Sequence, residues 1–360
     1  MRILVITTDA FGGHGGIAQY NRDLLTALAA MPEVEEVVGV PRNLQFPPGE
    51  LPAKLRYHPE AAGSKLRFVR KAFAIAHGHF DLILCGHVNL LPVAALLNLK
   101  IKAPLVLLIY GIDVWQSHPS ALVRRIIGKV DAVWSISEIT RDKMMAWSGL
   151  DQEKFAILPN AINLDRYGPG PRTTTLVKRY GLDGRRVIMV LCRLSGTERY
   201  KGVDEVLELM PRLFLKEPRL TFLVAGDGDD RPRLEGKAAT LGVADRVVFT
   251  GFVPEAEKID HYRLADAFVM PGRGEGFGFV FLEALACGVP VVASKLDGSR
   301  EAVRNGLLGR LVDPTAPAEL EAAILGVLDE PHGVPDGLAY FSFPEFQKRV
   351  TEATRKAVKR

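Results

Sequence analysis

The chain has 360 residues, a formal net charge of +4, and a composition that is 48% hydrophobic and 24% charged. This length is too great for one ordinary core and predicts two α/β domains of a globular, soluble protein. No apolar run reaches the ~20 residues that span a bilayer, which excludes a transmembrane helix.

The positive charge is concentrated in one segment. Residues 51–130 contain eleven Lys/Arg against three Asp/Glu, a local net charge of +8, so we expect an anionic partner to face this segment. The cysteines Cys85, Cys192 and Cys287 lie far apart and the first two adjoin apolar runs, so we expect reduced, buried thiols and a cytoplasmic protein. The chain opens on a short β-branched strand rather than a long apolar run, so no secretory signal is expected.

Strand-like apolar runs alternate with helical patterns along the chain. The first series comprises residues 3–6, 37–40, 82–85, 105–109 and 132–135, and the second comprises residues 187–192, 220–225, 246–250, 267–270 and 289–293. Such runs, apolar on both faces and separated by crossover-length helices, predict parallel, doubly wound sheets. The predicted fold class is α/β, with two Rossmann-like domains facing a central cleft, because such folds bind ligands outside the carboxyl ends of their strands.

Two breaks in this pattern divide the chain into three parts. Residues 159–172 contain several prolines and glycines and separate a first domain, 1–165, from a second, 166–340. A turn at Ser342-Phe343-Pro344 precedes a basic, helix-like segment, so we expect residues 341–360 to form a C-terminal helix that packs back on the first domain.

The most informative stretch runs from Glu275 to Glu283. It contains Gly276-Phe277-Gly278, which predicts a loop that opens a helix, with Glu283 two turns into that helix. Unpaired N–H groups at a helix start favour anionic or hydroxyl-rich ligands, and both carboxylates can accept hydrogen bonds from vicinal hydroxyls. Arg193 and Lys201, which flank a loop after an apolar strand, can neutralise a diphosphate. Together these residues outline a nucleotide-sugar site.

A glycine-rich turn at residues 12–16 follows the first strand. Residues 13–18 also fit the dinucleotide fingerprint Gly-x-Gly-x-x-Ala, which alone is a weak signal. Five residues separate the strand from the glycines, and residues 40–43 offer no acidic group after the second strand, so a nicotinamide site is the weaker interpretation. Apart from Asp81, no carboxylate or cysteine lies at ligand spacing from His77, His79 and His87, so no metal site is expected.

Two basic runs, residues 64–73 and 123–129, alternate cationic and apolar side chains at near-helical spacing. A solvated helix face explains them as well as an anionic membrane surface does. Each Lys or Arg near an anionic leaflet contributes ~1 kcal/mol, and a lipid-linked acceptor would make such a contact useful. Nucleic acid is not expected as a partner, because the aromatic interleaving of strand-binding platforms is missing.

At these residues the chain resembles the large family of retaining glycosyltransferases called family 4, which has the GT-B fold. The resemblance covers nearly the whole chain and rests on seven ordered motifs: Gly12–Ala18, Leu158–Ile162, Arg193-Leu194-Ser195 with Lys201-Gly202, Val224–Gly228, Gly251-Phe252-Val253, Glu275–Glu283 and Gly288–Ser294. It implies a hexosyltransferase of bacterial polysaccharide or glycolipid synthesis. The enzyme would use a UDP- or GDP-sugar as donor and a saccharide or lipid-linked saccharide as acceptor, with no metal and no cofactor.

The resemblance also implies roles for single residues. Arg193 and Lys201 bind the donor diphosphate and stabilise its growing charge, and Glu275 holds the sugar hydroxyls. The other donor-binding positions are Gly15, Gly16, Val253, Gly276, Phe277, Gly278 and Glu283, the last of which takes the ribose hydroxyls. Gly13 and Asp113 lie on the acceptor side, in an N-terminal acceptor-binding domain that complements a C-terminal donor-binding domain.

Two positions depart from the family pattern. The family carries His-Gly-x-Asp after the fourth strand, whereas this chain has Tyr110-Gly111-Ile112-Asp113. The Tyr110 hydroxyl can still donate a hydrogen bond to the sugar or the leaving oxygen, but a phenol with a reference pKa of about 10 is a poor base. A retaining reaction in which the leaving phosphate takes the acceptor's proton survives this change. The usual glycine pair after the final strand is replaced by Asp297-Gly298-Ser299. We expect this change to give the chain a donor or acceptor preference different from that of other family members.

The sequence therefore predicts a cytoplasmic hexosyltransferase, which could also bind peripherally at the inner face of the cell membrane. Three rival classes stay open: a NAD-dependent oxidoreductase, a catalytically idle nucleotide-sugar-binding partner of another enzyme, and a phosphorylase of the same fold.

Overall fold

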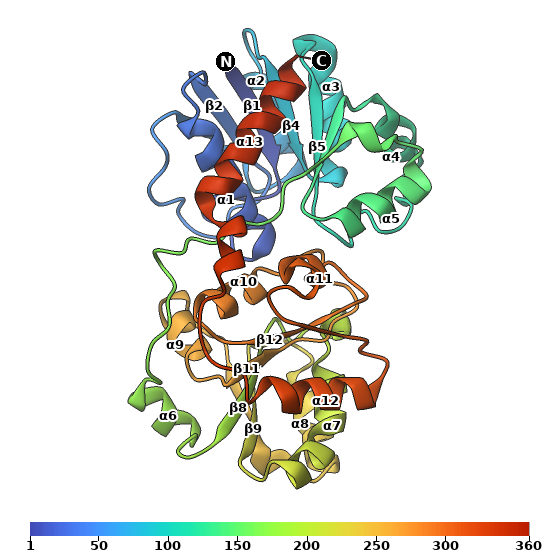
Figure 1. Ribbon diagram of the computed structural model, residues 1–360. Coiled ribbons are helices and arrows are strands. Elements are labelled where there is room, and N and C mark those ends of the chain that lie inside the picture. The colour runs from blue at the N-terminus through green and yellow to red at the C-terminus, as the bar shows by residue number, and fades with distance from the viewer. Residues whose placement is uncertain (360) are drawn as a thin grey trace. The chain divides into compact units, whose positions relative to one another are not determined.

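The computed structural model describes residues 1–359, which fold into two compact units (Figure 1). Unit 1 contains Met1–Ala161 and the chain from Phe341 onward, and unit 2 contains Ile162–Tyr340. The division after Ala161 lies slightly before residue 165, where the sequence pattern placed it. The C-terminal helix returns to unit 1, as the predicted fold class requires.

Unit 1 is built on a seven-stranded parallel sheet with the order β3-β2-β1-β4-β5-β6-β7. Its strands are β1 (Arg2–Thr7), β2 (Glu36–Pro41), β3 (Leu55–Tyr57), β4 (Leu82–Gly86), β5 (Leu105–Ile109), β6 (Ala132–Ser135) and β7 (Phe155–Ile157). In the inner strand β1, Leu4 is in register with Val38 of β2 and Ile83 of β4. These three side chains are fully buried, which explains why the strands appear in the sequence as continuous apolar runs.

The helices of unit 1 cover both faces of this sheet. They are α1 (Gly16–Ala30), α2 (Lys65–Ile75), α3 (Leu91–Ile101), α4 (Ala121–Ile126), α5 (Glu138–Ser148) and α13 (Phe343–Val358). Helices α2 to α5 contribute to one core cluster together with strand residues. The connection β1-α1-β2 runs along the sheet in the opposite direction to β4-α3-β5, so right-handed crossovers place α1 on the other face.

The C-terminal helix α13 packs beside α1. Figure 1 shows α13, in red, in front of the sheet of unit 1. The Phe346 ring meets the Tyr20 ring edge-on with 5.6 Å between centroids, and Arg355 Nε lies 2.5 Å from Glu33 Oε1. An aromatic contact near its start holds α13 on α1, and an ion pair near its end holds it on the loop that follows α1.

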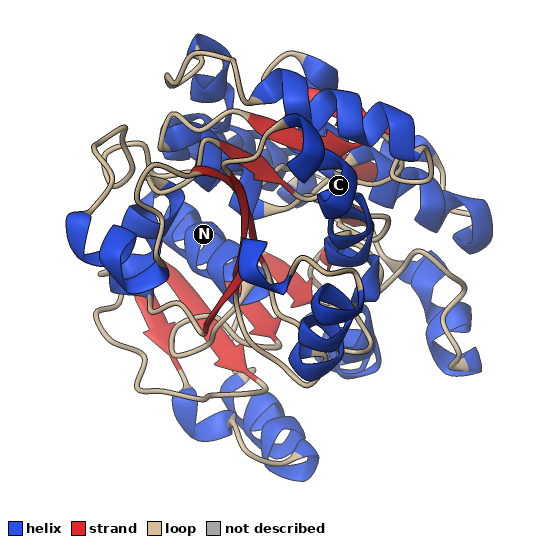
Figure 2. Cartoon of the chain, turned by 90° about the horizontal axis from the view of Figure 1, so that it is seen from below, coloured by secondary structure: helices blue, strands red, loops and turns tan. Residues whose placement is uncertain are grey.

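Unit 2 is built on a six-stranded parallel sheet with the order β10-β9-β8-β11-β12-β13. Its strands are β8 (Arg186–Leu191), β9 (Leu220–Ala225), β10 (Val247–Gly251), β11 (Ala267–Val269), β12 (Val291–Ser294) and β13 (Arg310–Val312). Its helices are α6 (Thr174–Tyr180), α7 (Val203–Lys216), α8 (Arg231–Thr240), α9 (Lys258–Tyr262), α10 (Phe279–Ala286), α11 (Ser299–Ala302) and α12 (Pro317–Val327). Figure 2 shows the helices of the whole chain in blue and its strands in red.

Two Rossmann-like parallel sheets confirm the predicted fold class. The three cysteines are buried and free, as expected. No described helix, within residues 1–359, is long and apolar enough to cross a membrane.

Candidate functional site

The loop after β8 carries the two cations that the sequence singled out. β8 ends at Leu191, Arg193 lies two residues after it, and Lys201 lies two residues before the start of α7. This loop leaves the carboxyl end of a central strand, where ligands of parallel sheets bind. Gly226 and Gly228 support the loop closely, because a Cβ atom on them would lie 1.9 Å from the Cys192 oxygen and 2.0 Å from the Leu194 oxygen.

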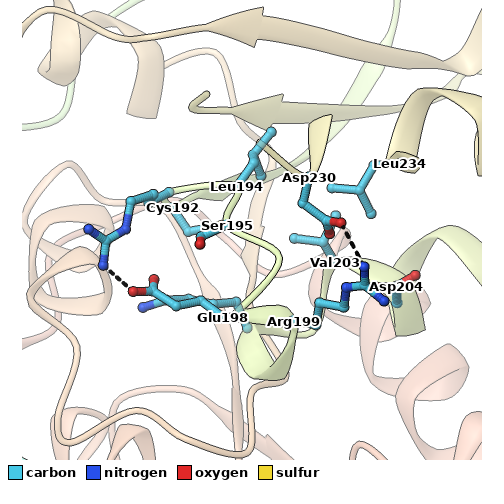
Figure 3. Close-up of a pocket in the computed structure, with 11 residues that line it drawn as sticks. Cys192, Leu194, Ser195, Glu198, Arg199, Val203, Asp204, Asp230 and Leu234 are labelled. Carbon is cyan, nitrogen blue, oxygen red and sulfur yellow. Dashed lines mark hydrogen bonds and ion pairs between the residues drawn. The ribbon is translucent and has the colours of Figure 1, made fainter. Parts of the chain in front are cut away.

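Arg193 and Lys201 line one small pocket, whose other lining residues are labelled in Figure 3. Its volume of about 10 Å³ holds roughly one water molecule. The Arg193 side chain is 71% exposed and pairs with Glu198. Lys201 is mostly buried and pairs with Glu275. Each cation is therefore neutralised by a carboxylate of the same unit.

The pKa of Lys201 keeps its ammonium charged. Burial alone would lower this pKa, but the Glu275 carboxylate outweighs burial and raises it above the ordinary value for lysine. The ion pair also satisfies two groups that are largely removed from water.

Two further carboxylates line the pocket and are also neutralised. Arg233 donates to Asp204 through both terminal nitrogens, at 2.8 and 2.6 Å, and to Asp230 through Nε and Nη2, at 2.7 and 2.6 Å. Lys237 Nζ lies 2.5 Å from Asp204 Oδ1, and Arg199 lies 3.2 Å from Asp230. These pairs limit the repulsion that a bound phosphate would meet from the pocket wall.

The loop at Glu275 is fixed by the turn after β12. Asp297 Oδ2 accepts a hydrogen bond from the Glu275 N–H at 2.9 Å, and the Gly298 N–H donates to the Glu275 carbonyl at 2.8 Å. A Cβ atom at Gly298 would lie 2.0 Å from the Gly276 oxygen, so only glycine allows this approach. The unusual segment Asp297-Gly298-Ser299 thus positions the loop, a role that the sequence pattern did not indicate.

The segment Gly276-Phe277-Gly278 leads directly into α10. Gly278 is the residue before the helix and has a φ of 92°, a conformation that favours glycine. The Phe277 side chain is buried, so only the backbone of this segment is available to a ligand.

Glu283 lies nearer to the start of α10 than expected. It is the fifth residue of that helix, little more than one turn from its start rather than two. The buried Glu283 carboxylate accepts hydrogen bonds from Tyr167 (2.9 Å), Lys258 (2.6 Å) and Tyr262 (2.7 Å). A carboxylate offers about four acceptor positions, so one remains for a ligand hydroxyl. None of these three donors was identified from the sequence.

The segment after β10 presents Phe252 and Val253. The Phe252 side chain is 74% exposed, whereas Val253 is half-buried. An exposed aromatic ring at the carboxyl edge of the sheet offers an apolar face to a planar ligand.

In unit 1, the glycine-rich turn leads into the start of α1. Gly15 precedes the helix with a φ of 92°, and no atom lies within 4 Å of a Cβ built there. Arg22 Nη1 holds the turn by donating to the carbonyls of Ala10 and Gly13, at 3.0 and 2.8 Å. Gly16 is the first residue of α1, so Gly15 and Gly16 place helical N–H groups at the carboxyl end of β1.

Tyr110 follows β5 and points into unit 1. Its hydroxyl is buried and donates to Asn21 Oδ1 at 2.8 Å, and Asn21 in turn donates to Thr7 Oγ1 at 2.7 Å. Burial raises the pKa of Tyr110 well above its ordinary value. The Tyr110 hydroxyl is therefore a protonated donor that is already engaged within the protein.

Asp113 and His87 lie beside Tyr110. Asp113 accepts a hydrogen bond from the Tyr110 N–H at 3.2 Å, and burial raises the pKa of Asp113 to about 7. The His87 ring stacks on the Tyr110 ring with 6.4 Å between centroids, and His87 Nδ1 accepts the Asn89 N–H at 3.1 Å. Burial lowers the pKa of His87 to about 4, so its ring is neutral and Nε2 carries the proton. The sequence interpretation considered His87 only as a metal ligand.

Both halves of the chain match models of glycosyltransferase families. Residues 177–357 match the family model described as glycosyl transferases group 1, and residues 14–166 match the model described as glycosyltransferase family 4. These matches cover the units that contain Arg193, Glu275 and Tyr110.

Two curated relatives are mycobacterial mannosyltransferases. The chain is 36% identical over 227 residues to the GDP-mannose-dependent α-(1-6)-phosphatidylinositol monomannoside mannosyltransferase of Mycolicibacterium smegmatis, which covers 60% of this chain and only 58% of that relative. It is 31% identical over 306 residues to the phosphatidyl-myo-inositol mannosyltransferase of Mycobacterium tuberculosis, covering 82% of this chain and 74% of that protein.

Among solved structures, the chain resembles HepE of Anabaena in complex with UDP and glucose. The TM-score is 0.76 at 21% sequence identity, with 99% of this chain and 100% of that chain covered. At this identity the likeness demonstrates a shared fold.

Proposed function

Because the chain belongs to the glycosyl transferases group 1 family, we propose that it transfers a hexose from a UDP- or GDP-sugar to a saccharide or lipid-linked saccharide acceptor. The observation that carries this proposal is the pocket after β8, where Arg193 and Lys201 stand beside the Glu275 loop. Two cations and a backbone-lined loop suit a diphosphate joined to a sugar.

Donor binding is proposed to exchange carboxylates for phosphates. Arg193 leaves Glu198 and Lys201 leaves Glu275, so both cations can contact the diphosphate oxygens. The released Glu275 carboxylate then accepts hydrogen bonds from sugar hydroxyls. Glu283, with one acceptor position to spare, takes a ribose hydroxyl, and the base lies along Phe252 and Val253.

The reaction is proposed to retain the anomeric configuration and to need no metal. The two cations stabilise the negative charge that grows on the leaving diphosphate, which is the step where fixed charges contribute most. The leaving phosphate oxygen takes the proton of the acceptor hydroxyl. Because the leaving phosphate acts as the base, no side chain has to take this proton. The buried Tyr110 hydroxyl, which donates a hydrogen bond to Asn21, could not act as that base.

The donor and acceptor classes are supported by the relatives. One relative is named as GDP-mannose-dependent and the fold relative holds UDP and glucose, so both bases are candidates. Both mannosyltransferases are named for phosphatidylinositol acceptors, which supports a lipid-linked acceptor.

The test is hexose transfer by Lys201→Ala, with Lys178→Ala as the matched control. Lys178 is an exposed lysine on α6 of the same unit. Release of nucleoside diphosphate from UDP- and GDP-hexoses should be measured with acceptor and a metal chelator. We expect Lys201→Ala to lower turnover about 100- to 1000-fold, as the loss of one transition-state charge contact does, and Lys178→Ala to be unaffected. Turnover near that of the wild type in a folded Lys201→Ala variant would refute the proposal.

A further inference from the structure

The strand order of unit 1 reverses between β1 and β4. The chain runs from β1 through β2 to β3 on one side of the sheet, and it then returns to form β4 on the other side of β1. Ligands of parallel sheets bind outside the carboxyl ends of the two strands at such a reversal. The glycine-rich turn follows β1 at this place, and His87 follows β4 directly. His87 therefore borders the position where the topology favours a ligand.

Three contacts hold His87 and leave one nitrogen of its ring free. Nδ1 accepts the Asn89 N–H at 3.1 Å, the ring stacks on Tyr110 with 25° between the ring planes, and the His87 carbonyl accepts the Cys85 thiol at 3.3 Å. Because Nδ1 is an acceptor, the proton of the neutral ring is on Nε2. Within residues 1–359 this Nε2–H forms no hydrogen bond, and the ring is only half-buried.

A second free donor lies two residues further along the chain. His118 Nδ1 accepts the Ser120 N–H at 3.1 Å, so the proton of the His118 ring is on Nε2, which donates to Asn89 Oδ1 at 2.8 Å. The exposed Asn89 side chain therefore turns its oxygen to His118, and its Nδ2 amide forms no hydrogen bond within residues 1–359. We call His87, Asn89 and His118 the histidine cluster.

Both free donors of the histidine cluster are uncharged. Burial lowers the pKa of His87 to about 4 and also lowers the pKa of His118, so both rings are neutral near pH 7. Two neutral N–H groups suit the oxygens of sugar hydroxyls, each of which has lone pairs to accept a hydrogen bond. No group of three His, Cys, Asp or Glu side chains within the described residues could hold a metal ion, so the cluster is not a metal site.

We propose that the histidine cluster binds the saccharide acceptor. The His87 Nε2–H donates to one oxygen of the saccharide, and the Asn89 amide donates to a neighbouring one. Tyr110 contributes its ring as the support of His87, because its own hydroxyl is engaged with Asn21. This inference rests on the proposed transfer reaction and adds to it the side chains that hold the acceptor.

The experiment measures hexose transfer by the full chain from UDP-glucose and GDP-mannose to octyl glucoside, octyl galactoside and octyl mannoside, with separate KM values for donor and acceptor. His87→Asn keeps an acceptor for the Asn89 N–H near the position of Nδ1 but removes the Nε2–H. We expect its acceptor KM to rise about three- to tenfold, as the loss of one neutral hydrogen bond predicts. Its kcat and donor KM should stay within about twofold of the wild type.

Two further variants separate binding from a structural role. His87→Gln places an amide N–H near the position of Nε2 but loses the acceptor at Nδ1, and it should restore most of the acceptor affinity. His79→Asn is the matched control, because His79 precedes the same strand β4 at its opposite end and its side chain is 81% exposed. It should behave as the wild type does.

The outcomes distinguish this inference from the proposed function. An unchanged acceptor KM in folded His87→Asn, a rise in donor KM instead, no recovery in His87→Gln, or an equal change in His79→Asn would overturn the assignment of the histidine cluster alone. Absence of transfer by the wild type to all three glycosides would overturn the transfer reaction together with this assignment.

Discussion

Glu198 is predicted to compete with the donor diphosphate for Arg193. The Arg193 side chain is 71% exposed and Glu198 is 15% exposed, so their ion pair lies at the pocket rim. A pair of this kind contributes up to about 1 kcal/mol. Replacing Glu198 by Gln keeps the size of the side chain but removes the competing charge. We therefore expect Glu198→Gln to bind a nucleoside diphosphate about two- to fivefold more tightly than the wild type does.

The assay is isothermal titration of the nucleoside diphosphate into each protein at two salt concentrations. Glu208→Gln is the control, because Glu208 forms an ion pair with Lys237 in the same unit but does not line the pocket. Glu208→Gln changes the net charge by the same amount as Glu198→Gln, and its affinity for the nucleoside diphosphate should equal that of the wild type within error. The gain in Glu198→Gln should shrink at about 0.5 M salt. Weaker binding in Glu198→Gln, or an equal gain in Glu208→Gln, would refute the carboxylate-for-phosphate exchange.

Two further predictions concern unit 1. Tyr110→Phe removes the 2.8 Å hydrogen bond to Asn21 and leaves a buried acceptor unpaired, so the free energy of unfolding measured in urea should fall by about 1–3 kcal/mol. Turnover should stay within about twofold of the wild type. A large loss of turnover in the folded variant would show instead that Tyr110 is catalytic. Burial raises the pKa of Asp113 to about 7, well above the usual value for an aspartate, so the folded state holds the proton more tightly and its stability falls as pH rises from about 4 to 7. Asp113→Asn should remove this contribution, up to about 1.4 kcal/mol per pH unit, and an unchanged pH profile of unfolding would contradict the assignment.

The sheet strands were predictable wherever they are buried on both faces. Runs such as Leu105–Ile109 and Leu220–Ala225 have no exposed position and appear in the sequence without interruption. The strands Leu55–Tyr57, Phe155–Ile157 and Arg310–Val312 were not predicted. All three are short and lie at sheet edges, where one strand partner and partial exposure relax the demand for apolar residues.

The candidate site was predictable in its positions but not in its contacts. Motif spacing placed Arg193, Lys201 and Glu275 correctly near the carboxyl edge of a sheet. The pairing of Lys201 with Glu275 depends on side-chain placement across 74 residues of sequence separation, which no local pattern encodes. The same holds for Asp297, which fixes the Glu275 loop through one hydrogen bond to its backbone.

Glu283 and Tyr110 have hydrogen-bond partners that the family resemblance did not predict. The resemblance assigned Glu283 to a ribose, but three side chains from α9 and the segment before α6 already donate to its carboxylate and leave one acceptor position for that role. Tyr110 stands where the resemblance implies a histidine, and its hydroxyl donates a hydrogen bond to Asn21 of α1. Both environments are set by tertiary neighbours, so a motif alone did not reveal them.

A thermal-shift titration of the full chain with UDP, GDP, ADP and NAD, each with a metal chelator, tests whether the chain binds a nucleoside diphosphate. A ligand that binds only the native state adds about 2.7 kcal/mol of stability at 100 times its Kd. We expect a clear upward shift of Tm with UDP or GDP and a loss of that shift in Lys201→Ala. A shift with NAD alone, or with none of the four ligands, would contradict it.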